Sequence, residues 1–454
     1  MTATQIQPLM RRQLTILLAM YLGYAALMVC RNTLIVSSAA MVEDPNLDLD
    51  KESFGHLMSW HSAGAIAGKL VTGPGADLLG GRRMFLLALV LTGAANVGFA
   101  FCTSFAAFAF FNFAGQFAKA GGWPAMTKLV SAWYPPSSYG RVWSIISTSS
   151  RVGTIAAGLV LGWMLYTMPW QSVFIASAVF TGVICAWLLS ALKDRPDEPA
   201  VAQERRDHRL ALESREEAFR KDPIQQDLLE DRKHPLSGKS LQQACVRFLG
   251  SARCWTICAG IVFLTIVMDF LTFIPIYLSE SLGLDPSQAS MAGTSFPVGM
   301  FVALLVSSVL YDRFSKRQLA FCLTGMLLLS VLCVVGLWQM DLLPSHLRSF
   351  ASMLLLFTLG FTISPAYYVP MSVFAVAFGG RHSGFLVSVI DIFGYAGALV
   401  FNFYGGSIAQ EYGWDVFLCG LMGVCVCAVA SMASFFYLEY RPDRRSDVGM
   451  PGVV

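Results

Sequence analysis

Long apolar runs recur along most of this chain and constrain its fold more than any other feature. A helix needs about 20 apolar residues to cross the ~30 Å hydrocarbon core of a bilayer, and about twelve such runs occur in the 454 residues. Strands of that length and number are not expected. The sequence therefore predicts an all-α polytopic membrane protein. We expect spans at 13–40, 52–77, 83–103, 105–131, 140–167, 171–193, 252–279, 287–311, 318–339, 346–373, 383–409 and 414–438.

The first span is expected to stay in the mature protein. It follows Arg11 and Arg12, as the apolar part of a signal peptide would. However, it lacks a small-residue cleavage site and has a polar centre at Arg31, which a removable signal does not have.

Basic residues predict the orientation of the spans. Because Lys and Arg resist translocation, the side on which they gather is expected to be cytoplasmic. The opposite loops hold little beyond Lys51 and Arg348. Both termini are therefore predicted to be cytoplasmic, in a multi-pass protein of the inner or plasma membrane. The basic side holds Arg11, Arg12, Arg82, Arg83, Arg141, Arg313, Lys316, Arg317, Arg381, Arg441, Arg444 and Arg445.

Several other classes of function find no support. The net charge of +3 is what the loop asymmetry would leave, so we expect no nucleic-acid partner. The 11 cysteines lie mostly in apolar spans without zinc or disulfide spacing, and no metal or other cofactor is expected. "SGKS" at 237–240 lacks the first glycine of a phosphate loop. We expect a monomeric protein that is not an enzyme and that contacts the lipid bilayer and a small anionic substrate.

One long hydrophilic stretch, 195–240, divides six predicted spans from six. We therefore expect a first six-helix bundle at 1–194, a cytoplasmic linker at 195–247, a second six-helix bundle at 248–440 and a cytoplasmic tail at 441–454. Glu and Arg at three- and four-residue spacing in the linker indicate a solvated helix.

A weak internal repeat supports two related halves. "GPGADLLGGRR" (Gly73 to Arg83) follows the second span and "SVLYDRFSKR" (Ser308 to Arg317) follows the eighth. Each places an acid before a basic turn, which could clamp a neighbouring helix end and release it when the halves move. The alternative is an ordinary basic loop with a stray acid. The predicted gating residues are Asp77, Arg82, Arg83, Asp312 and Arg313.

"GADLLGGRR" resembles the loop signature of the major facilitator superfamily, and three further stretches resemble its organophosphate:phosphate antiporter branch. These stretches are "GYAALMVCRNTL" (23–34), "AGGWPAMTKLVSAWYPPSSYGRVWS" (120–144) and "DIFGYAGALVFNFYGGSIAQEYGW" (391–414). The resemblance implies two six-helix bundles around a central cavity that opens alternately to each side of the membrane.

The resemblance also implies an anion-binding arginine in span 1, which falls on Arg31, and a lysine in span 2, which falls on Lys69. Two positions depart from the pattern. Val267 stands where the family commonly has a second arginine in span 7, and Ser150 stands where a histidine is expected in span 5. These departures leave the substrate open.

Ionisable groups inside spans are costly unless they face protein or water, so each is a functional candidate. They divide by sign between the halves. Arg31, Lys69, Lys119 and Arg151 lie in the first half and are the candidate anion-binding cations, while Asp269 and Asp391 lie in the second half.

Arg31 lies deep in its span, and its planar fork of donors suits a phosphate or carboxylate. The alternative is a structural ion pair with Asp269 or Asp391. Lys69 could bind the anion or line the inner vestibule. Arg151 could replace the absent arginine of span 7, or lie near the interface if its span starts later.

Asp391, Tyr395 and Asn402 form one polar stripe at helical spacing in span 11. Tyr395 is a candidate substrate contact. Asp391 could neutralise Arg31 in the empty cavity, carry a proton or bind a substrate ammonium group, and Asp269 has the same alternatives. A purely structural pair is the remaining interpretation for each acid.

We therefore predict a secondary transporter that exchanges a phosphorylated metabolite for phosphate by alternating access. One alternative is proton-coupled transport of a carboxylate or zwitterion, which the two acids and Val267 favour. A second alternative, of another class, is a transporter-like membrane sensor that signals through the linker or the termini.

Overall fold

The computed structural model describes residues 3–134, 138–194, 241–311, 314–379 and 383–440, and these residues are mainly helical. The predicted tail, residues 195–240 of the predicted linker, and the predicted gating residues Asp312 and Arg313 lie outside the described residues. Asp77 lies in a described helix, but its side chain does not belong to the described part.

The first half contains eight labelled α-helices. They are α1 (Ala3–Val42), α2 (Lys51–Leu79), α3 (Gly81–Ala100), α4 (Phe105–Lys119), α5 (Gly122–Trp133), α6 (Tyr139–Ala156), α7 (Gly162–Met164) and α8 (Trp170–Ala191). A π-helical turn, Ala157–Leu161, joins α6 to α7.

The second half begins with a short helix and then repeats this plan. Its helices are α11 (Leu241–Leu249), α12 (Ala252–Asp269), α13 (Ile274–Leu282), α14 (Pro286–Gly293), α15 (Ser295–Tyr311), α16 (Lys316–Trp338), α17 (Ser345–Gly379), α18 (Ser383–Glu411) and α19 (Gly413–Tyr440). 3-10 turns lie at Phe270–Thr272 and Met340–Leu342.

These helices confirm the predicted all-α polytopic fold with about twelve spans. Four spans are built from consecutive pieces, namely α4 with α5, α6 with α7, α12 with α13, and α14 with α15. Within the described residues, 10 helices are long and apolar enough to cross a membrane. The helices α4 and α5, with 15 and 12 residues, are each shorter than the about 20 residues that one helix needs to cross the bilayer, so neither belongs to those ten by itself.

Local sequence explains where several helices begin and end. Asp50 caps α2 by accepting a 2.8 Å hydrogen bond from the backbone N–H of Ser53. Gly80, at φ +82°, makes the tight turn from α2 to α3, a conformation in which other residues would be strained. Gly283, at φ +65°, ends α13 in the same way.

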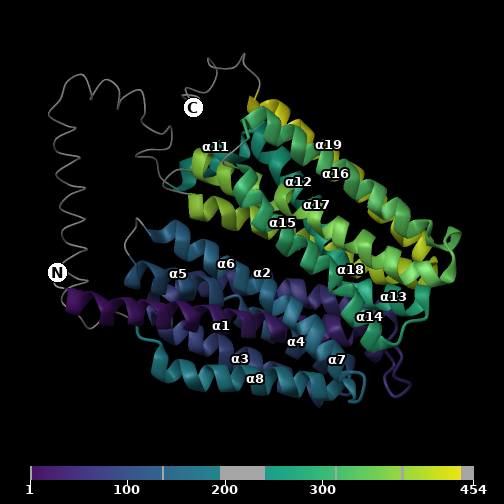
Figure 1. Cartoon of the computed structure of the whole chain (residues 1–454), viewed down its shortest axis with the longest axis horizontal. Helices are drawn as coiled ribbons and strands as arrows, with labels where there is room; N and C mark the ends of the chain where they lie inside the picture. The colour runs from purple at the N-terminus through teal and green to yellow at the C-terminus, as the bar shows by residue number, and fades with distance from the viewer. Residues whose placement is uncertain (1–2, 135–137, 195–240, 312–313, 380–382, 441–454) are drawn as a thin grey trace.

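Figure 1 shows the helices of the two halves as two groups. The groups lie closest at the end that holds α7, α13 and α14, and further apart at the end that holds the start of α1 and the end of α19. Hydrogen bonds at the close end support this arrangement. Ser287 Oγ on α14 donates to the carbonyl of Gly162 on α7 at 2.8 Å, and Ser290 Oγ donates to the carbonyl of Val36 on α1 at 2.5 Å.

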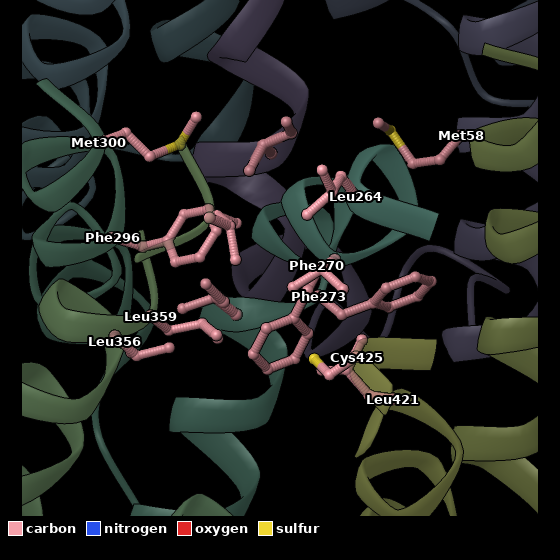
Figure 2. Packing of buried hydrophobic residues seen from close by; sticks show 14 of the residues in the cluster. Met58, Leu264, Phe270, Phe273, Phe296, Met300, Leu356, Leu359, Leu421 and Cys425 are labelled. Carbon is pink, nitrogen blue, oxygen red and sulfur yellow. The ribbon is translucent and has the colours of Figure 1, made fainter. Parts of the chain in front are cut away.

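A continuous apolar core crosses this junction. Phe54 on α2 packs edge-on against Phe273 of the second half, with ring centroids 6.2 Å apart. Figure 2 shows Met58 of the same helix in the cluster that contains Leu264 and Phe270. Burying this shared surface holds the halves together at the close end.

The backbones of α2 and α18 approach each other directly at Gly55. A Cβ atom at this position would lie 2.4 Å from the backbone oxygen of Asn402 and 3.0 Å from Cα of Gly406. Small residues allow such close approach between membrane helices. One turn further along α2, Ser59 Oγ donates to the carbonyl of Leu399 on α18 at 3.0 Å.

Replacing Gly55 with alanine is expected to destabilise this junction. The added methyl group would collide with the backbone of α18, so α2 and α18 must separate, at a cost of about 1–3 kcal/mol. The measurement is the thermal unfolding midpoint in detergent, which should fall by several degrees. Gly73→Ala in the same helix is the control, because a Cβ there meets nothing within 4 Å. Equal midpoints for both variants would contradict the close packing.

Candidate functional site

Arg31 on α1 belongs to a chain of polar contacts within the first half. Its Nε–H points at Nε2 of His61 on α2, 3.5 Å away. On the other side of the ring, Nδ1 of His61 lies 3.1 Å from Oδ1 of Asn112 on α4, and Asn112 Nδ2 donates to the carbonyl of Leu57 at 2.8 Å. A neutral imidazole with its proton on Nδ1 satisfies every contact in this chain. The chain therefore fixes the orientation of the Arg31 guanidinium.

The outer part of that guanidinium stays available. Among the described residues, no hydrogen bond engages the Nη atoms of Arg31, whose side chain is half-buried. A deep arginine whose Nε is held and whose Nη groups are free can offer a fork to an oxyanion.

Lys69 on α2 is bound by the second half. Its Nζ lies 2.5 Å from Oδ2 of Asp391 and 4.6 Å from the ring centroid of Tyr395, both on α18. The two charged side chains keep 28% and 22% of their surface exposed, so a ligand can still reach them. Tyr395 and Asp391 lie on one face of α18 because they are four residues apart.

Arg151 on α6 makes a second link between the halves. Its guanidinium donates to the hydroxyl of Tyr368 on α17 and lies over that ring, 4.9 Å from the centroid. Its Nε is buried, and no residue in the described part of the chain makes a hydrogen bond with it. Arg151 therefore lies in the interface between the halves, and the interpretation that placed it at the membrane surface is wrong.

Lys119, the last residue of α4, is 8% exposed. Among the described residues, none makes a hydrogen bond or ion pair with its ammonium group, although the charges of Arg31, Lys69 and Asp391 act on it. A buried ammonium beside other cations lacks a counter-charge, and an anion would supply it.

Asp269, the last residue of α12, accepts a hydrogen bond from Nδ2 of Asn402 on α18. A 3-10 turn follows it directly, so the regular helix is interrupted at this carboxylate. The charge of Arg31 acts on Asp269.

The structure brings the predicted substrate and coupling residues into one electrostatic cluster, which we call the central cluster. Electrostatic interactions connect residues of both halves within it. It consists of Arg31, Lys69, Lys119, Arg151, Asp269, Asp391 and Tyr395. Their roles as ligands stay predictions.

Two details differ from the sequence interpretation. Asp391 pairs with Lys69, whereas the sequence suggested Arg31 as its partner. His61 and Tyr368 were not among the predicted site residues, yet each contacts a cluster arginine. The polar residues of "WHS" and the paired tyrosines of "AYYVP" inside apolar spans are the signals that could have identified them.

A separate set of contacts joins the halves at the close end. Lys51 Nζ at the start of α2 lies 2.9 Å from Oε2 of Glu280 on α13, which also accepts a 2.7 Å hydrogen bond from Nε1 of Trp414. Nearby, Ser279 Oγ donates to Oε1 of Glu43 at 2.5 Å. These contacts lie at the ends of the apolar segments and close this end of the molecule.

Asp44, just after α1, anchors the same end. Its carboxylate accepts hydrogen bonds from the backbone N–H of Asn46 at 2.9 Å and from Nε1 of Trp170 at 2.9 Å. These hydrogen bonds lower the pKa of the Asp44 carboxyl below its usual value. The group therefore stays charged at neutral pH and ties α1 to α8.

Of the predicted gating residues, Arg82 is the best described. Its Nη2 donates to the carbonyl of Leu189 at 2.7 Å, and its backbone N–H donates to Oδ1 of Asp194 at 2.8 Å. Both partners lie at the end of α8 in the same half. Arg83, which like Arg82 lies at the start of α3, is exposed. The described residues contain no group of three or more His, Cys, Asp or Glu that could hold a metal ion.

Comparisons with known proteins agree with this architecture. The model of the Major Facilitator Superfamily matches residues 20–268 and 255–452. A probable hexose phosphate transport protein of Chlamydia trachomatis is 23% identical over 93% of this chain and 90% of its own length. The membrane sensor protein UhpC of Escherichia coli is 26% identical over 94% of this chain and 91% of its own.

Solved structures show the same fold. An inward-facing, unoccupied bacterial homologue of the human lysosomal transporter Spinster superposes with a TM-score of 0.67 at 17% identity. The alignment covers 94% of this chain and 96% of that protein.

Proposed function

This chain belongs to the Major Facilitator Superfamily, and from that premise we propose that it is a secondary transporter that exchanges a small phosphorylated organic anion for inorganic phosphate. The organophosphate branch of the superfamily is the proposed subgroup. This chain is similar along almost its whole length to a protein named as a probable hexose phosphate transport protein, which supports this choice.

The charge balance of the central cluster is the observation that carries the proposal. The cluster has four basic side chains, Arg31, Lys69, Lys119 and Arg151, and two acidic ones, so its formal charge is +2. A phosphate monoester carries about −1.5 to −2 at neutral pH. A single phosphoryl group would therefore neutralise the cluster.

The unpaired donors indicate where the phosphoryl group would bind. No described residue makes a hydrogen bond with the Nη groups of Arg31 or with the ammonium of Lys119, so these two side chains can bind an anion without breaking a described contact. Lys69 and Arg151 would join by exchanging Asp391 and Tyr368 for phosphate oxygens. Binding would then loosen two contacts between the halves, which couples anion binding to their relative movement.

We further propose that the close end faces the outside and that both termini are cytoplasmic. The distribution of Lys and Arg among the loops supports this orientation. In this state the cluster would be reached from the cytoplasm. Asp77, Arg82 and Arg83 would then lie at the cytoplasmic end of the first bundle, where they are proposed to clamp the opposite state; the same role is proposed from the sequence for Asp312 and Arg313, which lie outside the described residues.

Two alternatives have specific support. The two acids of the second half favour a proton-coupled transporter, which would respond to a pH gradient and not to internal phosphate. The 26% identity to a protein named as a membrane sensor favours a receptor that binds the anion without transporting it.

Exchange in proteoliposomes distinguishes the three functions. Vesicles loaded with phosphate are placed in labelled external phosphate, with or without organophosphates or a pH gradient. The proposal expects uptake that requires internal phosphate and is blocked by an organophosphate. Gradient-driven uptake without internal phosphate would support proton coupling, and binding without any uptake would support the sensor.

A further inference from the structure

Around Asp269 and Asn402, the second half has few hydrogen-bond donors and no ion-paired cation among the described residues. Within the described part of the chain, Asp269 receives one hydrogen bond, from Nδ2 of Asn402. Asn402 itself is fully buried, and no described residue makes a hydrogen bond with its Oδ1. Turning the amide over would only place Oδ1 against the carboxylate. Acceptor oxygens therefore outnumber donors at this point, which is rare for buried polar groups.

No lysine or arginine among the described residues forms an ion pair with Asp269. The charge of Arg31 acts on it, but the hydrogen bond of Arg31 goes to His61. A carboxylate inside a membrane protein without a contacting cation is costly and is a functional candidate by default. By contrast, Lys119 on α4 of the first half is a buried basic residue with which no acid of the described residues forms an ion pair. The site is thus polarised between its two halves.

The second half already binds one ammonium group. Lys69 Nζ contacts the Asp391 carboxylate at 2.5 Å and lies over the Tyr395 ring at 4.6 Å. A carboxylate together with an aromatic face is the arrangement that recognises ammonium groups. Asp269 with Asn402 likewise offers a carboxylate, together with an amide oxygen, and no lysine of the described residues contacts them.

Depth along the helices places Asp269 within reach of the proposed phosphate site. His61, the partner of Arg31, is six residues from Gly55, whose neighbour on α18 is Asn402. Six residues of helix span about 9 Å. Because the charge of Arg31 also acts on Asp269, we infer that a short organic group can bridge from a phosphate on Arg31 to the carboxylate of Asp269.

We propose that the transported organic molecule is a zwitterion with a phosphoryl or phosphonyl group at one end and an amine at the other. This inference rests on the phosphate exchange proposed above. The first half binds the anionic end through Arg31 and Lys119. The second half binds the ammonium end through Asp269, with Asn402 as an additional acceptor.

The test compares two probes that differ only in the amine. O-Phosphoethanolamine and ethyl phosphate have the same chain and phosphate, so their affinities for the purified protein, measured by calorimetry in detergent, report the ammonium contact alone. O-Phosphoethanolamine is expected to bind at least about tenfold more tightly. Asp269→Asn should remove this difference by weakening only the amine-bearing probe. Asp285→Asn, at an exposed loop position, should retain it.

Equal affinities of the unmodified protein for both probes would overturn the inference, and this comparison needs no variant to fold. A preference that persists in Asp269→Asn would overturn the role of Asp269. Phosphate exchange in vesicles is measured in parallel. If exchange is present while the preference is absent, only this inference fails. If neither phosphate nor either ester is bound or exchanged, the proposed function fails with it.

Discussion

Arg31→Lys is expected to reduce phosphate exchange about a hundredfold while the protein still inserts and folds. Lysine keeps the charge but offers no planar fork, so two parallel hydrogen bonds to the phosphoryl group are lost. A charge-assisted hydrogen bond contributes about 1.5–3 kcal/mol, which converts to at least a tenfold change for each bond. The measurement is the initial rate of exchange in vesicles that contain equal amounts of protein.

Arg253→Lys is the matched control for this variant. Arg253 pairs with Glu439 at 3.2 Å, away from the central cluster, so lysine there should leave exchange unchanged. Full activity of Arg31→Lys would remove Arg31 from the binding site. Equal losses in both variants would indicate a general effect of replacing arginine on folding.

Lys69→Gln is expected to affect both stability and transport. The change leaves Asp391 charged, half-buried and without its cation, and breaking such a pair costs about 2 kcal/mol at this degree of exposure. The unfolding midpoint should therefore fall. Exchange should be nearly abolished, because the cluster also loses one of its four cations.

The double variant Lys69→Gln with Asp391→Asn separates these two effects. Neutralising the orphaned acid should restore most of the unfolding midpoint, since no uncompensated charge remains. Exchange should stay low, because the anion still lacks Lys69. Recovery of transport along with stability would mean that Lys69 serves only to hold the two halves together and does not bind the anion.

The chemical type of each side chain explains which site residues were found from the sequence. Arg31, Lys69, Lys119, Arg151, Asp269 and Asp391 were identified because each is an ionisable group in a long apolar run. His61 and Tyr368 were not, because an isolated imidazole or phenol in such a run is common in packed helices. Only their contacts with Arg31 and Arg151 distinguish them.

The sequence by itself determined that this chain is a polytopic helical protein, where its spans lie, and that its intramembrane charges divide by sign between two halves. The physical reason is that lipid tolerates neither unpaired backbone groups nor unpaired charge, so apolar length and rare ionic residues carry strong information.

Only the tertiary structure decided the pairings. Asp391 contacts Lys69 and not Arg31, and Arg151 contacts Tyr368. Asp269 accepts a hydrogen bond from Asn402. Each pairing depends on the depth and rotation of helices that are distant in the sequence, and for the two pairings between the halves these are set by close contacts such as Gly55 against the backbone of α18. Helical periodicity within one span defines which residues share a face, but it contains no information on which face of a distant helix lies opposite.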